Sequence, residues 1–192
     1  MVSHPSNLLP LYTALAAAEL GSNFHFEFSR YVYIPQQISE KRDWFTIPAE
    51  NAEEAWKQST SSLKAHEEIA LHSRVTGHQG MRHLPFLDMG CAHIENHLDD
   101  LKLAFKDFNI PKMTIFSSGR SYHIYGHGLL RDDASLVRFM GRILLLNLPQ
   151  KERVIDERWV GHRLMAGYLT LRWTHNNPYY KTLPKFLLET TT

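Results

Sequence analysis

The stretch Lys112–Gly128, KMTIFSSGRSYHIYGHG, predicts a β-hairpin. Its first part, Met113–Phe116, is apolar and β-prone, and the following Ser117–Arg120 (SSGR) is typical of a tight turn. Ser121–Tyr125 then resumes the strand pattern. A hairpin in the middle of the chain indicates an antiparallel sheet, and the rest of the sequence is interpreted around it.

Alternation along the second strand of this hairpin places a hydroxyl and an imidazole side by side. Ser121 and His123 are two residues apart and share a face, whereas Ile124 points to the other face, toward a core. The Ser121 hydroxyl and a ring N–H of His123 can donate to phosphate oxygens, and Arg120 can bind two oxygens at once. The stretch therefore predicts an anion pocket. The alternative is a surface hairpin whose histidine is satisfied within the protein.

Length and composition indicate one globular domain. The 192 residues suffice for one core and are few for two domains, and 43% hydrophobic and 21% charged residues are ordinary proportions. A formal net charge of +1 argues against a general polyanion binder, so any nucleic-acid surface must be local. The single cysteine, Cys91, fits a reducing compartment, and no apolar run suits a signal peptide or a membrane span. We therefore expect a cytoplasmic protein that has no membrane partner.

Hydrophobic periodicity and the positions of glycine and proline predict a mixed order of helices and strands. This order suits an α+β fold with helices on a mainly antiparallel sheet better than a doubly wound parallel sheet. Helices are expected at 11–20, 51–72, 94–108, 134–148 and 159–165, strands at 24–34, 44–47, 84–88, 113–116, 121–125 and 168–173, and a loop from Asn176 onward.

Two short apolar runs end in an aspartate. Leu84–Asp88 (LPFLD) precedes the hairpin, and Val154–Asp156 follows it. Carboxylates at strand ends beside a phosphate pocket are what two-metal phosphoryl or nucleotidyl transfer requires, because hard divalent cations prefer oxygen ligands. We expect Asp88 and Asp156 to converge beside His123, although they are far apart in sequence.

The succession FLDMG, SSGRSYHIY, VID and LRW resembles the archaeo-eukaryotic primase superfamily, the primase-polymerases. Members of that family share an apolar strand ending in two alternating acids, a Ser-x-His strand, and an apolar segment followed by Asp. Asp88, Ser121 with His123, and Asp156 match these three motifs, and Arg172 resembles a basic residue of a later strand. The resemblance extends from Leu84 to Lys185, and the Ser-x-His strand is its most specific part.

The resemblance implies a primase-polymerase-like nucleotidyltransferase that adds nucleotides to a nucleic-acid 3′-end and releases pyrophosphate. It implies one domain, 1–192, with an N-terminal α/β module at 1–80 and an RRM-like catalytic core at 81–192. The implied partners are nucleotides, a DNA or RNA template and, in trans, a helicase or another replication or defence protein. The implied site residues are Asp88 and Asp156 for Mg²⁺ or Mn²⁺, His123 as a further catalytic residue, and Arg120, Ser121, His123 and Arg172 for the nucleotide.

One position departs from the family pattern. The second acid of the first motif would stand at position 90, which is glycine. Losing a carboxylate from a two-metal site removes a ligand and a negative charge. Either another acid compensates (Glu95, Asp99 or Glu157), or the protein is a catalytically degenerate nucleotide- or nucleic-acid-binding subunit with the same fold.

The basic residues gather toward the end of the chain. Residues 151–192 contain seven basic and four acidic residues, whereas residues 51–110 contain six basic and nine acidic ones. Because phosphate contacts dominate nucleic-acid affinity, Arg158, Arg163, Lys181 and Lys185 are candidate nucleic-acid contacts. A solvated surface without a partner is the alternative.

The twelve histidines raise a third possibility, a zinc-dependent phosphodiesterase. His93 and His97 are four residues apart on an expected helix, a spacing that can bind a metal. They flank the apolar stripe instead of forming it, and HIENH is not the HExxH motif because its glutamate is misplaced. We expect exposed side chains there instead of a zinc site.

Overall fold

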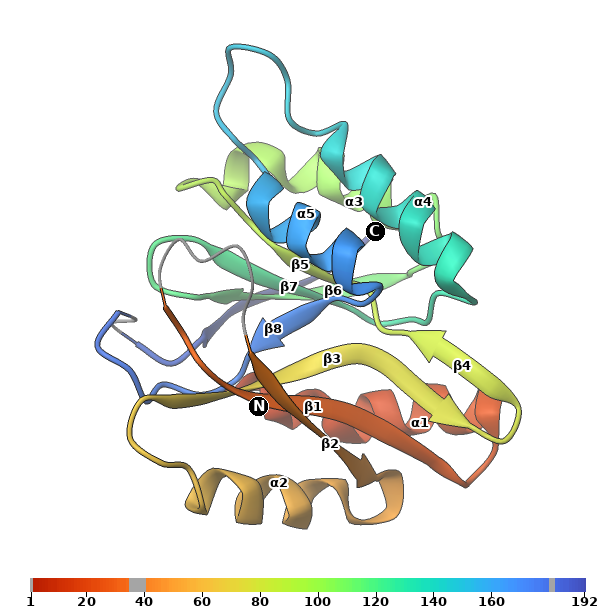
Figure 1. Ribbon diagram of the computed structural model, residues 1–192. Helices are drawn as coiled ribbons and strands as arrows, with labels where there is room; N and C mark the ends of the chain where they lie inside the picture. Colours follow the sequence, from red (N-terminus) through yellow and green to blue (C-terminus); the bar gives the residue numbers. More distant parts are fainter. Residues whose placement is uncertain (1, 35–40, 180–181) are drawn as a thin grey trace.

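The computed structural model describes residues 2–34, 41–179 and 182–192, and they form two antiparallel sheets (Figure 1). Sheet A has the order β2–β1–β3–β4, with β8 also pairing with β3, and sheet B has the order β5–β7–β6–β9. The α+β class with antiparallel sheets is confirmed. The strands are β1 (Phe24–Val32), β2 (Arg42–Pro48), β3 (Glu67–Gly77), β4 (Gly80–His83), β5 (Phe86–Asp88), β6 (Lys112–Ser117), β7 (Tyr122–Gly126), β8 (Thr170–Arg172) and β9 (Lys185–Thr191).

Five α-helices cover the two sheets from opposite sides. Figure 1 shows α3, α4 and α5 above sheet B, and α2 beneath sheet A. Asp132 caps α4 through its side chain, and Gly167 ends α5 in the left-handed conformation that glycine tolerates best. The helices are α1 (Leu9–Leu20), α2 (Ala52–Ser61), α3 (Leu98–Lys106), α4 (Asp133–Leu144) and α5 (Glu157–Ala166).

Trp173 joins the two sheets in one core. Its side chain is fully buried, and its ring lies 5.8 Å from Phe28 of β1 and 5.3 Å from Trp56 of α2. On the other side its indole N–H donates to the Tyr125 hydroxyl of β7 at 2.9 Å. An aromatic side chain in such a place contributes packing to both layers, so that truncation to alanine costs about 3–5 kcal/mol.

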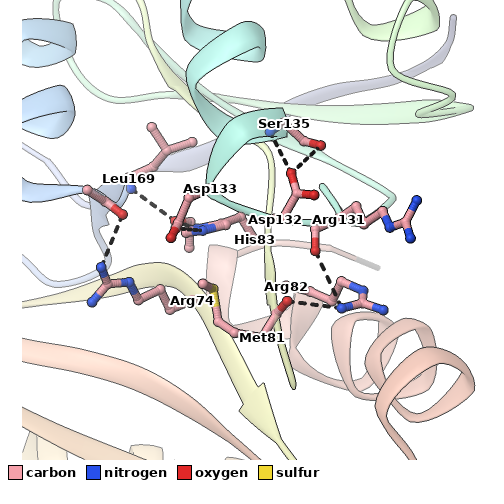
Figure 2. Close-up of polar contacts among 11 residues, drawn as sticks. Arg74, Met81, Arg82, His83, Arg131, Asp132, Asp133, Ser135 and Leu169 are labelled. Carbon is pink, nitrogen blue, oxygen red and sulfur yellow. Dashed lines mark hydrogen bonds and ion pairs between the residues drawn. The ribbon is translucent and has the colours of Figure 1, made fainter. Parts of the chain in front are cut away.

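A chain of buried polar contacts ties sheet A to the first turn of α4 (Figure 2). The Ser73 hydroxyl and His83 Nδ1 are 2.9 Å apart, and His83 Nε2 lies 2.9 Å from Asp133 Oδ1. The backbone N–H of Leu169 donates to Ser73 Oγ at 3.0 Å. Arg82 of β4 also donates to the carbonyl of Arg131, just before α4. These contacts bind β3, β4, α4 and the segment before β8 to one another.

Two of the expected elements are wrong. The helix predicted for 51–72 ends at Ser61, and Glu67–Gly77 is the central strand of sheet A. Thr60, Ser61 and Ser62 are weak helix formers, while Ile69, Leu71 and Val75 are buried on a strand. The tail predicted as loop contains β9, which pairs with β6 and closes that edge of sheet B.

Candidate active site

Backbone pairing brings three of the expected residues together at one end of sheet B. Asp88 is directly opposite His123 in the β5–β7 register. The next residue, Met89, forms an isolated bridge with Ile155, and the N–H of Asp156 donates to the carbonyl of Asp88 at 3.2 Å. We call Asp88, His123 and Asp156 the acid site. Two carboxylates and one imidazole from three separate segments therefore share a small volume.

Asp88 is held in an environment that disfavours its negative charge. Burial, followed by the negative charge of Asp156, raises the pKa of Asp88 to about 8, while Arg172 and Arg163 act in the opposite direction. Its side chain retains 29% exposure, so a ligand can reach it. A half-buried carboxyl group whose pKa is raised so far is a candidate functional group.

His123 is almost completely buried and incompletely satisfied. Its side chain is 7% exposed, and Nε2 lies 3.8 Å from Asp88 Oδ1, beyond hydrogen-bond range. Among the residues that the structure describes, none pairs with Nδ1. Burial and the charge of Arg172 lower the pKa of His123 to about 3, so the ring is neutral. A buried nitrogen without a partner is costly, so a hydrogen bond to Nδ1 from a water or a ligand would stabilise the site.

Asp156 caps the helix that follows it. Its Oδ1 accepts hydrogen bonds from the N–H groups of Arg158 at 3.0 Å and Trp159 at 3.2 Å. This role alone accounts for an aspartate at the start of α5. The cap uses Oδ1, and the negative charge of Asp156 acts on Asp88 as the second cause of its raised pKa, after burial.

Asn147 positions the segment that carries Asp156. Its Oδ1 accepts from the N–H groups of Val154 and Ile155, both at 2.9 Å, and its Nδ2 donates to the Ile155 carbonyl at 3.1 Å and to Glu157 at 2.9 Å. Sequence reasoning missed this residue. An asparagine after a helix is common in any loop, so no local signal marked it.

The remaining residues of the expected anion pocket differ in their exposure and in their hydrogen-bond partners. The Ser121 hydroxyl donates to the Met89 carbonyl, and Arg120 is exposed on the turn after Gly119, whose φ is 118°. Arg172 is 5% exposed and donates to the Thr174 carbonyl, and its positive charge acts on both Asp88 and His123. Arg172 therefore contributes charge to the site, while the Ser121 hydroxyl is engaged by the protein.

The aliphatic part of Arg153 lies where a side chain at position 90 would begin. A Cβ on Gly90 would be 2.9 Å from both Cγ and Cδ of Arg153. The three acids named as substitutes have partners elsewhere. Glu95 pairs with His93 at 3.3 Å, Asp99 pairs with Lys102 at 3.5 Å, and Glu157 accepts from Asn147.

The candidate nucleic-acid residues differ in exposure. Arg158 is exposed on α5, and Lys185 is exposed at the start of β9. Arg163 is 7% exposed, donates to Thr170 Oγ1 at 2.8 Å and lies over the Tyr168 ring, so it binds α5 to β8 within the protein. Lys181 lies outside the described residues.

Other constellations in the structure do not form catalytic or zinc sites. Within the described ranges, no group of three or more His, Cys, Asp or Glu side chains is arranged to hold a metal. His93 is 67% exposed and His97 pairs with Glu152. The chain from Ser73 through His83 to Asp133 contains the side chains of a hydrolase triad, but Ser73 and His83 are fully buried and no substrate can reach the hydroxyl.

Residues 48–185 match the model of the AEP-like family, described as archaeo-eukaryotic primase 1D-like. The match spans well over half of the chain, and the protein belongs to this family; the predicted resemblance to the archaeo-eukaryotic primase superfamily is thereby confirmed. No curated protein and no solved structure matches the chain. Across the described residues, no helix is both long and apolar enough to span a membrane.

Proposed function

We propose that this primase-like domain is a nucleotidyltransferase that adds nucleotides to a nucleic-acid 3′-end in a metal-dependent reaction. The observation that carries the proposal is the acid site, where two carboxylates repel each other beside a buried imidazole with an unsatisfied nitrogen. Family membership supports interaction with nucleotides and nucleic acid. At the acid site, a phosphate could accept a hydrogen bond from His123, and a cation could offset the negative charges of Asp88 and Asp156.

The donor set of the acid site fits one Mg²⁺ or Mn²⁺ ion. Such ions are commonly bound by one or two carboxylates, with phosphates and water completing the shell. Asp88 and Asp156 would supply the two carboxylates, and a bound cation would favour the ionised form of Asp88, whose pKa is raised by burial and then by the charge of Asp156. When bound, the ion would polarise the α-phosphate and stabilise the charge that develops during displacement.

The protein side chains would hold the nucleotide in line for attack. The neutral ring of His123 can donate one N–H to a phosphate oxygen, which satisfies a nitrogen that is otherwise buried. Arg172 adds a fixed positive charge close by, and the exposed Arg120 can reach the outer phosphates from the turn. Bound phosphates and a bound cation would favour the ionised form of Asp88, which would release its proton to solvent. The primer hydroxyl would lose its proton to solvent as its oxygen bonds to the α-phosphorus, and the bond between this phosphorus and the bridging oxygen to the β-phosphate would break to release pyrophosphate.

The alternative is a nucleotide- or nucleic-acid-binding subunit that lacks polymerase activity. The arrangement at Gly90 favours it, because the Arg153 side chain occupies the space of the second acid. A site with two carboxylates in place of three binds metals more weakly. This alternative retains the same pocket and predicts nucleotide binding that does not depend on a divalent ion.

A primer-extension assay with Mn²⁺ tests the enzymatic proposal. We expect extension by the wild-type protein and its loss in Asp88→Asn and His123→Ala. Asp99→Asn is the matched control, because it removes the same charge from a side chain that is 99% exposed. Absence of extension in the wild type, combined with metal-independent nucleotide binding in calorimetry, would overturn the enzymatic proposal and support the binding subunit. A cytoplasmic location and a replication or defence partner stay predictions.

A further inference from the structure

The face of sheet A that points away from α2 is polar. Paired residues share a face, so Trp44 of β2 lies beside Ser29, and Thr170 and Arg172 of β8 lie beside His72 and Ala70 of β3. Phe26 and Phe28, between the residues of this face, point into the core instead. We call this surface the polar face of sheet A.

Trp44 is the exposed aromatic residue of this face. It stands in the middle of the edge strand β2 and is 50% exposed. Its ring meets His72 at 4.7 Å and Tyr168 at 4.6 Å, both edge-to-face, and those two rings stack on each other at 4.3 Å. His72 is fully buried and Tyr168 is 4% exposed. The indole is thus held by two buried rings while half of it faces solvent.

Guanidinium groups surround these rings. The Cζ atom of Arg74 lies 5.9 Å from the Trp44 ring and 5.2 Å from Tyr168, and that of Arg163 lies 5.8 Å from Tyr168. Arg42 donates to the Ser29 hydroxyl at 3.0 Å. Burial lowers the pKa of His72 to about 4, so this ring is neutral beside Glu27. Among the described residues, these three arginines and one carboxylate, Glu27, lie around the rings, and this excess of positive charge favours an anionic ligand.

We propose that Trp44 is a stacking platform for a base of single-stranded nucleic acid, and that Arg74 and Arg42 contact the adjoining phosphates. An exposed ring fixed by its neighbours, with cationic side chains around it, is the combination that binds single strands without sequence preference. The inference deepens the proposed function by assigning the path of the template.

Strand β8 connects this platform to the acid site. Tyr168 lies under Trp44, and Arg172, four residues later, acts electrostatically on Asp88 and His123. Only Thr170–Arg172 of this segment is strand, and four residues of chain span at most about 13 Å. A template strand that places one base at the acid site can therefore place a base a few nucleotides away on Trp44.

Fluorescence anisotropy with a labelled oligo-dT of about 12 nucleotides tests the platform. We expect Trp44→Ala to weaken binding about tenfold or more, and Trp44→Phe to weaken it less than about threefold, because phenylalanine keeps a stacking ring. Arg74→Gln should reduce the slope of log K against log salt by about one, since one phosphate contact is lost. Arg138→Gln, an exposed arginine on α4, is the matched control and should leave that slope unchanged.

A second measurement uses the unmodified protein and does not depend on how the variants fold. Of the four tryptophans, Trp56 and Trp173 are buried and Trp159 is half-buried, so the quenching by oligo-dT that is present in the wild type and missing in Trp44→Phe reports on Trp44. Binding of Trp44→Ala within twofold of the wild type would overturn the inference, as would unquenched emission on a saturated complex.

Calorimetry of nucleotide binding separates the platform from the proposed function. Trp44→Ala should bind a nucleotide with Mn²⁺ as the wild type does. Wild-type protein that binds oligo-dT through Trp44 but binds no nucleotide would overturn the proposed function and support the platform. Wild-type protein that binds nucleotide, with Trp44→Ala still binding oligo-dT normally, would overturn the platform alone.

Discussion

Replacing Asp88 by asparagine should make the protein less sensitive to rising pH. The folded state keeps a proton on Asp88 up to a pKa of about 8, whereas the unfolded chain releases it near the ordinary value of 3.8. The folded state therefore binds more protons between these values, and the free energy of unfolding falls as pH rises. This part of the stability is present at low pH and is lost on approaching pH 8. Asp88→Asn has the same shape without a titrating proton and should not show the loss.

The size of the effect follows from the difference of one proton. From about pH 6.5 to about pH 8, the wild type should lose roughly 1.6 kcal/mol relative to the variant. For a chain of this length, that is a relative change in Tm of about 3–6 °C. Because 29% of the Asp88 side chain is exposed, solvent screens part of the effect, and these values are upper limits.

Thermal unfolding of both proteins in a series of buffers measures this difference. His123 and the other titrating groups are present in both proteins, so most of their contributions cancel, and Asp99→Asn controls for the loss of charge. Mn²⁺ at about ten times its Kd should restore about 1.4 kcal/mol to the wild type near pH 8, and nothing to the variant. Parallel pH profiles for the wild type and Asp88→Asn would refute the reasoning, since they would show that Asp88 ionises normally.

Three further predictions concern the scaffold of the site. Asn147→Ala should lower the free energy of unfolding by about 2–3 kcal/mol in urea titration, because the amide holds Val154 and Ile155 beside Asp156. The same variant should show a smaller Mn²⁺-induced rise in Tm. An unchanged metal response would show that Asp156 is not positioned by Asn147. Gly90→Asp should enlarge the Mn²⁺-induced rise in Tm relative to Gly90→Ala, which crowds Arg153 equally but adds no carboxylate; equal responses would exclude position 90 as a ligand position. Glu68→Ala should destabilise by about 3 kcal/mol, because the buried carboxylate accepts from Thr174, Asn176 and Asn177, and a loss below about 1 kcal/mol would contradict this.

Sequence patterns predicted those elements whose signals lie within one short stretch of the chain. The hairpin of β6 and β7 was predictable because apolar alternation and the turn residues around Gly119 lie within one short stretch. Strand β3 was mistaken for a helix because it follows one without a glycine or proline between them. That error also concealed His72 and Arg74, which belong to the polar face of sheet A.

The convergence of the acid site could not be read from periodicity. It depends on the bridge between Met89 and Ile155, two ordinary apolar residues more than sixty positions apart. The family motifs indicated Asp88 and Asp156 as candidates. The contacts of Asn147 and the position of the Arg153 side chain beside Gly90 have no signature in a single sequence. Long-range contacts between side chains of common types are decided by the assembled fold.

The polar joint through His83 determines how the molecule can deform. Hinge opening between sheet A and α4 would separate His83 from Asp133 and leave the buried Nε2 of His83 without its partner, whereas the contact between Ser73 and His83 lies within sheet A. A buried group that loses its hydrogen bond costs about 1–3 kcal/mol, so this joint resists opening. Under the proposed function, templates and nucleotides would meet a preset spacing at this joint, and adjustment would fall to exposed side chains such as Arg120.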